Sequence, residues 1–230
     1  MQVIAFASTK GGVGKSTIAA VAADGLLRRG DTIRVIDCDP QGTLRKWARP
    51  VAERNERLVV TSIELGDDAT FAHYYNAMLE AFEPETDWVL IDTAGSDDFK
   101  QLAALAISDL VVCPSGPIEA ELLGVQKTLG YLDMALKEIG TETNPMDMLR
   151  VVYQKPGSFP NAQMHAVREL IFDHFGTVDE IHQSSAIASF LGRKMTTDEI
   201  IAEGADPKPI RKMQEAADRL TVNLEGQFDE

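Results

Sequence analysis

Cysteine is nearly absent from this chain, and long apolar runs are absent altogether. Its 230 residues include only two cysteines, Cys38 and Cys113, each set among apolar residues. Such a pair excludes a disulfide-rich secreted scaffold and the ligand clusters of zinc sites, so we expect two buried thiols. No apolar run approaches the roughly 18 residues that a membrane-spanning helix needs. Met1 leads straight into a predicted strand rather than a signal peptide, and we therefore expect a cytoplasmic protein.

Positive charge is also scarce. The chain has 22 Lys and Arg residues against 36 Asp and Glu, a net charge of −14. A protein that binds nucleic acid presents a positive face to the phosphates, so this balance argues against DNA binding unless basic side chains gather locally. The composition is otherwise that of a globular protein, with 44% hydrophobic residues. The length suits one α/β domain over residues 1–230.

Two kinds of apolar segment alternate along the chain. Short β-branched runs predict strands, and longer segments with apolar residues at helical spacing predict helices. The predicted strands are 3–7, 32–38, 58–63, 88–91, 110–114, 149–153 and 178–181. The predicted helices are 16–29, 43–56 (facing solvent), 70–82, 102–107, 119–139, 162–175 and 210–224. The alternation predicts an α/β fold, a single doubly wound, mostly parallel sheet with helices on both faces.

A phosphate-binding loop follows the first predicted strand. The pattern G-x-x-x-x-G-K-[ST] is present, with Thr9 in place of its first glycine. Backbone N–H groups of the loop and the start of the next helix would surround phosphate oxygens of ATP. Lys15 is expected to reach the β- and γ-phosphates, Ser16 to bind Mg²⁺, and Thr17 to donate to the α-phosphate. The nucleotide-binding residues predicted in this loop are Lys10, Gly11, Gly12, Val13, Gly14, Lys15, Ser16 and Thr17.

A second lysine stands at the head of this loop. Lys10 has no function in an ordinary phosphate-binding loop, but a lysine there can reach a nucleotide held by another copy of the chain. The loop resembles the deviant Walker A signature of the ParA/MinD family of ATPases, which partition plasmids and chromosomes or position other cargo. It looks closest to small ParA-type proteins without an N-terminal DNA-binding domain. The resemblance implies a homodimer on ATP binding, and hydrolysis that is slow alone and stimulated by a ParB-like or other adaptor protein.

Two carboxylates fall at the ends of predicted strands. Residues 37–42 resemble the switch I segment of the family, in which Asp39 would help to hold Mg²⁺ through water and would orient the attacking water. Asp37 would fix the loop or join the Mg²⁺ shell. Another strand ends at Asp92, as a Walker B strand does, and this carboxylate would hold Mg²⁺ through water. Gly95 would bring its N–H to the γ-phosphate. Because carboxyl ends of parallel strands meet at one edge of a sheet, we expect these residues beside the loop.

Contacts with adenine and DNA rest on the resemblance. In the family, the segment after the strand 149–153 lies near adenine, so Gln154 would read the base edge; a surface turn at 155–156 explains these residues as well. ParA relatives bind nonspecific duplex DNA as ATP dimers, through basic residues in the C-terminal part. The candidates here are Arg168, Arg193, Lys194, Lys208, Arg211 and Lys212. A solvated helix end is the alternative for these clusters.

Other functional classes compete with a DNA-binding partition ATPase. A MinD-like membrane positioner needs a basic amphipathic C-terminal helix, but residues 223–230 are acidic and anionic lipid would repel them, so we expect no membrane partner. A metal-cluster carrier needs bridging cysteines, which Cys113 alone does not supply. An ATP switch that positions a protein complex without DNA fits the net charge of −14. The prediction is a cytoplasmic ParA-like ATPase, associated with the nucleoid if it binds DNA.

Overall fold

The computed structural model describes residues 1–66, 68–95, 98–156, 161–182 and 184–228. In them, seven strands form one sheet in the order β3-β2-β4-β1-β5-β6-β7, and every neighbouring pair is parallel. The strands are β1 (Gln2–Phe6), β2 (Ile33–Asp37), β3 (Leu58–Ser62), β4 (Trp88–Asp92), β5 (Leu110–Ser115), β6 (Leu149–Lys155) and β7 (Gly176–His182). The helices are α1 (Lys15–Arg29), α2 (Thr43–Ala52), α3 (Phe71–Glu80), α4 (Phe99–Ala106), α5 (Glu119–Glu138), α6 (Pro145–Met148), α7 (Ala162–His174), α8 (Ser185–Arg193), α9 (Thr197–Ala202) and α10 (Pro207–Glu225).

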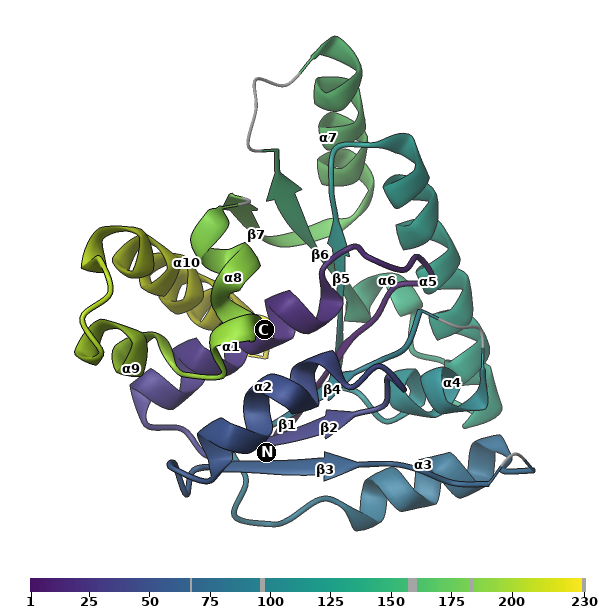
Figure 1. Cartoon of the computed structure of the whole chain (residues 1–230). Helices are drawn as coiled ribbons and strands as arrows, with labels where there is room; N and C mark the ends of the chain where they lie inside the picture. Colours follow the sequence, from purple (N-terminus) through teal and green to yellow (C-terminus); the bar gives the residue numbers. More distant parts are fainter. Residues whose placement is uncertain (67, 96–97, 157–160, 183, 229–230) are drawn as a thin grey trace.

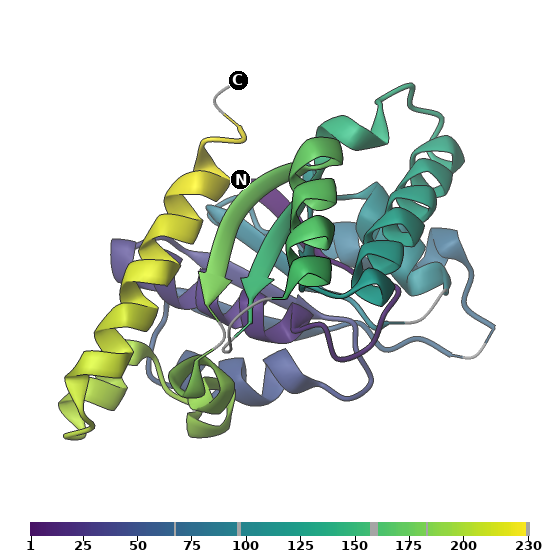
Figure 2. The ribbon, with the colours of Figure 1, turned by 90° about the horizontal axis from the view of Figure 1, so that it is seen from above.

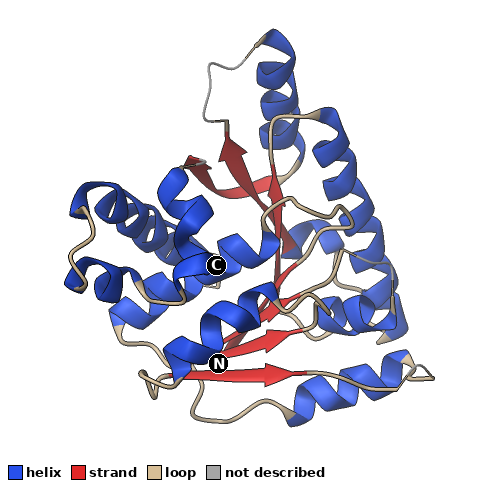
Figure 3. Ribbon diagram, in the orientation of Figure 1, coloured by secondary structure: helices blue, strands red, loops and turns tan. Residues whose placement is uncertain are grey.

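Helices cover both faces of this sheet (Figures 1 and 3). On one face, α1, α2, α8, α9 and α10 pack against alternate strand residues such as Ile4 and Phe6. On the other face, α3, α4, α5 and α7 pack against the residues between them, such as Val3 and Ala5. This division follows from the two-residue period of a strand, whose successive side chains point to opposite faces. The predicted doubly wound α/β fold is confirmed.

The central strand places the phosphate-binding loop. β1 lies between β4 and β5, where the chain changes from one half of the sheet to the other. Phe6 at the end of β1 is in register with Asp92 at the end of β4, which is in turn in register with Asp37 at the end of β2. Ligands of such sheets bind at the carboxyl edge beside this change of direction. The fold therefore gathers the loop and the two carboxylates at one edge.

The helix predicted at 43–56 does not face solvent along its whole surface. α2 ends at Ala52, and its buried residues are Leu44, Trp47, Ala48 and Val51. The ring of Trp47 lies 5.3 Å from that of Phe190 in α8, and its indole N–H donates to the Met195 carbonyl at 2.9 Å. The prediction is wrong because α2 packs against β2, β3, α1 and α8. The sequence pattern did not predict α8, α9 or the short α6.

Both cysteines are free and buried, as predicted. Burial raises the pKa of the Cys113 thiol to about 11 and raises that of Cys38 as well. The thiolate is the reactive form of cysteine, so neither side chain is a nucleophile at neutral pH. Among the described residues, no helix is long and apolar enough to cross a membrane.

A buried carboxylate connects α1 to the C-terminal helices. Asp24 accepts hydrogen bonds from the backbone N–H and the hydroxyl of Thr197, at 2.8 and 2.6 Å, and the Gln214 amide donates to the same hydroxyl at 3.0 Å. α10 packs against α1 beside this contact and crosses it at a large angle (Figure 2). Burial raises the pKa of Asp24 to about 6, helped by the charge of Asp198 and opposed by Thr197 and Arg28. The folded protein therefore holds this proton in mildly acidic solution.

We expect Asp24 to make the protein less stable as the pH rises. Its pKa is about 6 in the folded protein against an ordinary 3.8, so the folded state binds the proton more tightly and the free energy of unfolding decreases from about pH 4 through pH 6. Between roughly pH 5 and 8, the wild type should lose about 1.5 kcal/mol relative to Asp24→Asn, which does not titrate at this site. Urea unfolding of both proteins measures this difference, and parallel pH profiles would contradict it.

Candidate active site

The loop that joins β1 to α1 has a backbone that glycine adopts most readily. Gly12 and Gly14 have φ angles of 77° and 86°, in the left-handed region where other residues are strained. Gly14 is also the N-cap of α1, and no side chain caps this end of the helix. The first N–H groups of α1 are therefore left to bind an anion in the loop, with the helix dipole behind them.

The lysine at the end of this loop is buried. Lys15 begins α1 and is 7% exposed. Among the residues that the structure describes, it forms no ion pair. An ammonium group away from water is costly unless an opposite charge compensates it. Lys15 thus suits a ligand that carries negative charge, and Ser16 and Thr17 follow it in the first turn of α1.

Asp92 is a buried carboxylate at the same edge. It is fully buried, and neither of its oxygens has a hydrogen-bond partner in the described part of the chain. Burial raises the pKa of Asp92 to about 7; the carboxylates of Asp37 and Asp39 add to this shift, while the nearby Ser16 hydroxyl and Lys15 oppose it. An orphaned carboxylate beside a serine hydroxyl fits a cation such as Mg²⁺.

The described residues contain no group of three or more His, Cys, Asp or Glu side chains arranged to hold a metal ion. A cation beside Asp92 would therefore complete its shell with phosphate oxygens and water. Mg²⁺ is bound in this way at many nucleotide sites, because it keeps several waters and takes few protein carboxylates.

Asp37 fixes the loop after β2. Its carboxylate accepts the N–H of Asp39 at 3.0 Å and the N–H of Arg45 at 2.7 Å, which joins the loop to the start of α2. Burial raises the pKa of Asp37, although these hydrogen bonds oppose the shift. Asp39 is only half-buried, and its carboxylate accepts the N–H of Gln41 at 2.8 Å. Of the two roles expected for Asp37, these contacts favour that of a loop brace.

Gly95 and Gln154 both touch the phosphate-binding loop. A Cβ on Gly95 would lie 3.3 Å from the Gly11 nitrogen, so the chain after Asp92 passes close over the loop. The side-chain amide of Gln154, at the carboxyl end of β6, donates to the Val13 carbonyl. The fold therefore brings these predicted nucleotide-binding residues to the loop, while the role of Gln154 toward adenine stays a prediction.

The head of the loop is fastened to α5. The Thr9 N–H donates to the Thr128 hydroxyl at 3.3 Å, and the Thr9 hydroxyl donates to the Gly124 carbonyl at 3.5 Å. Lys10 follows directly, and its Nζ lies 3.9 Å from Glu121 Oε1. The sequence analysis missed these α5 residues, because nothing in the pattern of a helix marks which turn will meet a loop 119 positions away.

Five of the six basic residues predicted to bind DNA lie on two helices, α8 and α10. Arg193 and Lys194 end α8, and the others stand in the first turns of α10: Lys208, Arg211 and Lys212. All of them are exposed and without an ion pair to any described residue. Arg168 is different, because it pairs with Glu180 at 2.6 Å and lies 4.2 Å from the ring of Phe172. Arg168 shares the Glu180 carboxylate with Lys155, so its charge is partly compensated.

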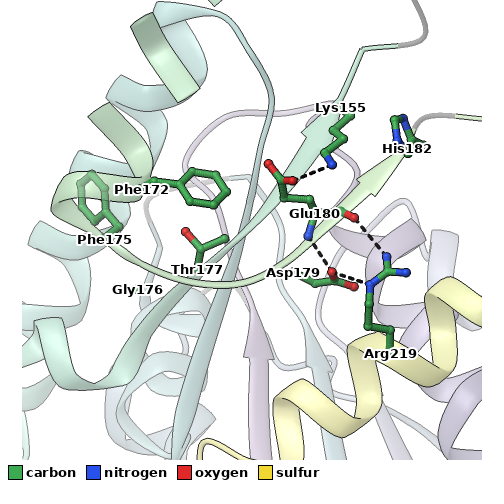
Figure 4. Close-up of a pocket in the computed structure, with 9 residues that line it drawn as sticks. All are labelled: Lys155, Phe172, Phe175, Gly176, Thr177, Asp179, Glu180, His182 and Arg219. Atoms are coloured by element: carbon green, nitrogen blue, oxygen red, sulfur yellow. Dashed lines mark hydrogen bonds and ion pairs between the residues drawn. The ribbon is translucent and has the colours of Figure 1, made fainter. Parts of the chain in front are cut away.

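A cleft of about 680 Å³ lies along β7, between α7 and α10 (Figure 4). Its charged side chains are paired with one another, Glu180 with Lys155 at 2.6 Å and Asp179 with Arg219 at 2.8 Å. None of the residues predicted to bind nucleotide or metal lines this cleft. The predicted site is instead the edge formed by the loop, Asp92 and the end of β2.

Comparison with known proteins identifies the family. Residues 4–197 match the family described as the CobQ/CobB/MinD/ParA nucleotide binding domain. The chain belongs to this family. The resemblance to ParA/MinD proteins, which rested on the phosphate-binding loop and the strand ends, is confirmed.

Curated relatives of this CobQ/CobB/MinD/ParA domain include partition and positioning proteins. The chain is 29% identical over 143 residues to the maintenance of carboxysome distribution protein A of Halothiobacillus neapolitanus, a match that covers 62% of this chain and 61% of the relative. It is 32% identical over 163 residues to the chromosome-partitioning ATPase Soj of Thermus thermophilus, covering 62% and 64%. The chain thus spans less than two thirds of the length of these relatives.

Solved structures show the same fold over nearly the whole chain. A putative plasmid partition protein from Borrelia burgdorferi, bound to AMPPNP, matches with a TM-score of 0.71 and 15% identity, covering 98% of this chain and 99% of that one. At this level of identity the likeness shows the fold of the ParA/MinD family and no more.

Proposed function

We propose that residues 1–230 form one ATPase domain of the ParA type. It dimerises on binding ATP, binds nonspecific DNA, and segregates or positions a plasmid, a chromosome or other cargo. An adaptor protein, ParB-like or of another kind, stimulates hydrolysis and so releases the dimer. The observation that carries this proposal is a lysine and a carboxylate buried at one edge, Lys15 and Asp92: Lys15 forms no ion pair with any described residue, and the Asp92 oxygens have no hydrogen-bond partner among them. The partition and positioning roles named for the relatives support the cargo function.

The proposed chemistry divides among the residues at the edge of the sheet. Residues 11–17 hold the triphosphate, with Lys15 at the β- and γ-phosphates and Ser16 at Mg²⁺. Asp92 supports the metal shell through water, and Asp39 orients the attacking water. Bound Mg²⁺ would neutralise charge that develops on the phosphate oxygens. Most of the catalysis then comes from positioning and from charge stabilisation, which need no covalent step on the protein.

The remaining site residues complete the nucleotide contacts. Gly95, whose backbone lies over the loop, would donate its N–H to the γ-phosphate, and Gln154 would lie near adenine. Lys10 would act on the nucleotide of the second chain, where its charge stabilises the transferring phosphoryl group. The proposed location is the cytoplasm, at the nucleoid while the dimer holds DNA.

Binding to random-sequence duplex DNA tests the partition function most directly. We expect binding with ATP and not with ADP or without nucleotide, and we expect it to weaken steeply across a salt series because phosphate contacts release counterions. Absence of binding in every nucleotide state would remove DNA from the proposal. The net charge of −14 would then favour the second candidate function, an ATP switch that positions a protein complex without DNA.

We expect Arg211→Glu to weaken DNA binding without changing the affinity for ATP. Arg211 is exposed in the first turns of α10, between Lys208 and Lys212. Loss of one phosphate contact should reduce the slope of log affinity against log salt by about 1. Lys137→Glu is the matched control, because it changes the charge equally at the far end of α5. Equal DNA affinity of both variants and wild type at matched salt would count against this surface.

A further inference from the structure

The side chain of Lys10 lies along α5 of its own chain. A Cβ on Gly124 would be 3.4 Å from the Cβ of Lys10, an ordinary van der Waals distance, so the lysine side chain begins directly beside the helix. One turn earlier, Glu121 Oε1 is 3.9 Å from Lys10 Nζ. A side chain on Gly116 would collide with the Glu121 carboxylate, so this glycine leaves room for the pair. The Lys10 side chain thus packs on α5 of its own chain and forms an ion pair there with Glu121.

Lys10 and Glu121 form a partly exposed ion pair. Among the described residues, neither Lys10 nor Glu121 has a second ion pair, and their side chains are 33% and 19% exposed. Thr9 bonds to Thr128 and Gly124, so the backbone before Lys10 is also held on α5. The side chain of Lys10 extends from this fixed backbone to Glu121. While Lys10 pairs with Glu121, its ammonium group does not bind a nucleotide held by a second chain.

We propose that Glu121 is a positioning residue that keeps Lys10 on its own chain and so opposes ATP-dependent dimerisation. This inference rests on the proposed function, in which Lys10 acts across the dimer. When the dimer forms, Lys10 of each chain leaves Glu121 and binds the phosphates of the nucleotide held by the other chain. Partly exposed ion pairs are individually weak, and each dimer breaks two of them. Neutralising Glu121 should therefore tighten the dimer by about three- to tenfold.

The test measures self-association of Glu121→Gln by sedimentation equilibrium, with Mg²⁺ and AMPPNP or with ADP. Glutamine keeps the shape of the side chain and removes its charge. Glu119→Gln is the matched control, because Glu119 is exposed in the same turn of α5 and its substitution removes the same charge. The double variant Lys10→Ala/Glu121→Gln should dimerise no more tightly than Lys10→Ala alone. Thermal unfolding and ADP affinity should match the wild type in each Glu variant.

Each outcome decides the inference. A tighter dimer for Glu121→Gln with AMPPNP alone, absent in the Lys10→Ala background, supports it, and so does a dimer that only this variant forms. A wild-type dimer that Glu121→Gln weakens or leaves unchanged overturns the inference and leaves the proposed function standing. If wild type and Glu121→Gln are both monomeric with AMPPNP, the proposed dimer switch fails, and the role of Glu121 fails with it.

Discussion

Replacing Lys10 with alanine is expected to abolish adaptor-stimulated ATP hydrolysis and to leave ATP binding largely intact. Lys10 stands at the loop head, against α5, whereas the buried ammonium of Lys15 lies at the start of α1. Binding of the triphosphate by its own chain would depend on Lys15 and on the α1 N-terminus. A cation that acts on the transferring phosphoryl group from outside is typically worth at least about 100-fold in rate. We therefore expect a loss of at least about 100-fold in stimulated turnover.

Two measurements separate these effects. Fluorescent ATP-analogue titration reports binding, and phosphate release with and without the adaptor reports turnover; adding duplex DNA tests whether it alone stimulates. Lys137→Ala is the control, because this exposed lysine lies at the far end of α5, where it pairs with Asp133. Wild-type stimulated turnover in Lys10→Ala would rule out action of Lys10 across the dimer. A large loss of ATP affinity would instead make Lys10 part of the site on its own chain.

The strands and the phosphate-binding loop were predictable because their signals are local. Buried parallel strands are short β-branched runs, and the loop is a fixed pattern of glycines and lysines between a strand and a helix. Parallel pairing then places all strand ends at one edge, so the meeting of Asp92 with the loop followed without knowledge of the strand order. Even the brace made by Asp37 was among the two roles expected for it.

The rest depended on contacts between distant segments. Part of the buried face of α2 packs against Phe190 of α8, a contact that residues 43–56 do not reveal by themselves. The fastening of Thr9 to α5 depends on Gly124 and Thr128, whose roles appear only when the fold brings them to the loop. Gln154 was expected near adenine, and the structure adds its contact with Val13 of the loop. These contacts depend on tertiary packing, which the local sequence pattern does not predict.

Asp92→Asn is expected to stabilise the nucleotide-free protein and to disable hydrolysis. The Asp92 carboxylate is fully buried with both oxygens unpartnered in the described structure, and burial raises its pKa to about 7 although Lys15 and Ser16 oppose the shift, so a negative charge at this position is costly. Asparagine has nearly the same shape and no charge, so the free energy of unfolding without nucleotide should rise by about 1–3 kcal/mol. The same change removes the charge that would support Mg²⁺, and we expect ATP turnover to fall by at least about 100-fold.

A variant that is more stable but less active is the result expected of a functional site, because the protein would lose stability when a purely structural carboxylate is replaced. Chemical denaturation in EDTA measures the stability, and phosphate release with Mg²⁺ measures the activity. Asp87→Asn, just before the same strand, is the matched control: its carboxylate accepts the N–H and hydroxyl of Thr32 at 2.8 and 2.7 Å, which lower its pKa. That substitution should destabilise the protein modestly and leave hydrolysis unchanged. If Asp92→Asn were instead less stable and fully active, Asp92 would be a structural carboxylate, because a site residue trades stability for function.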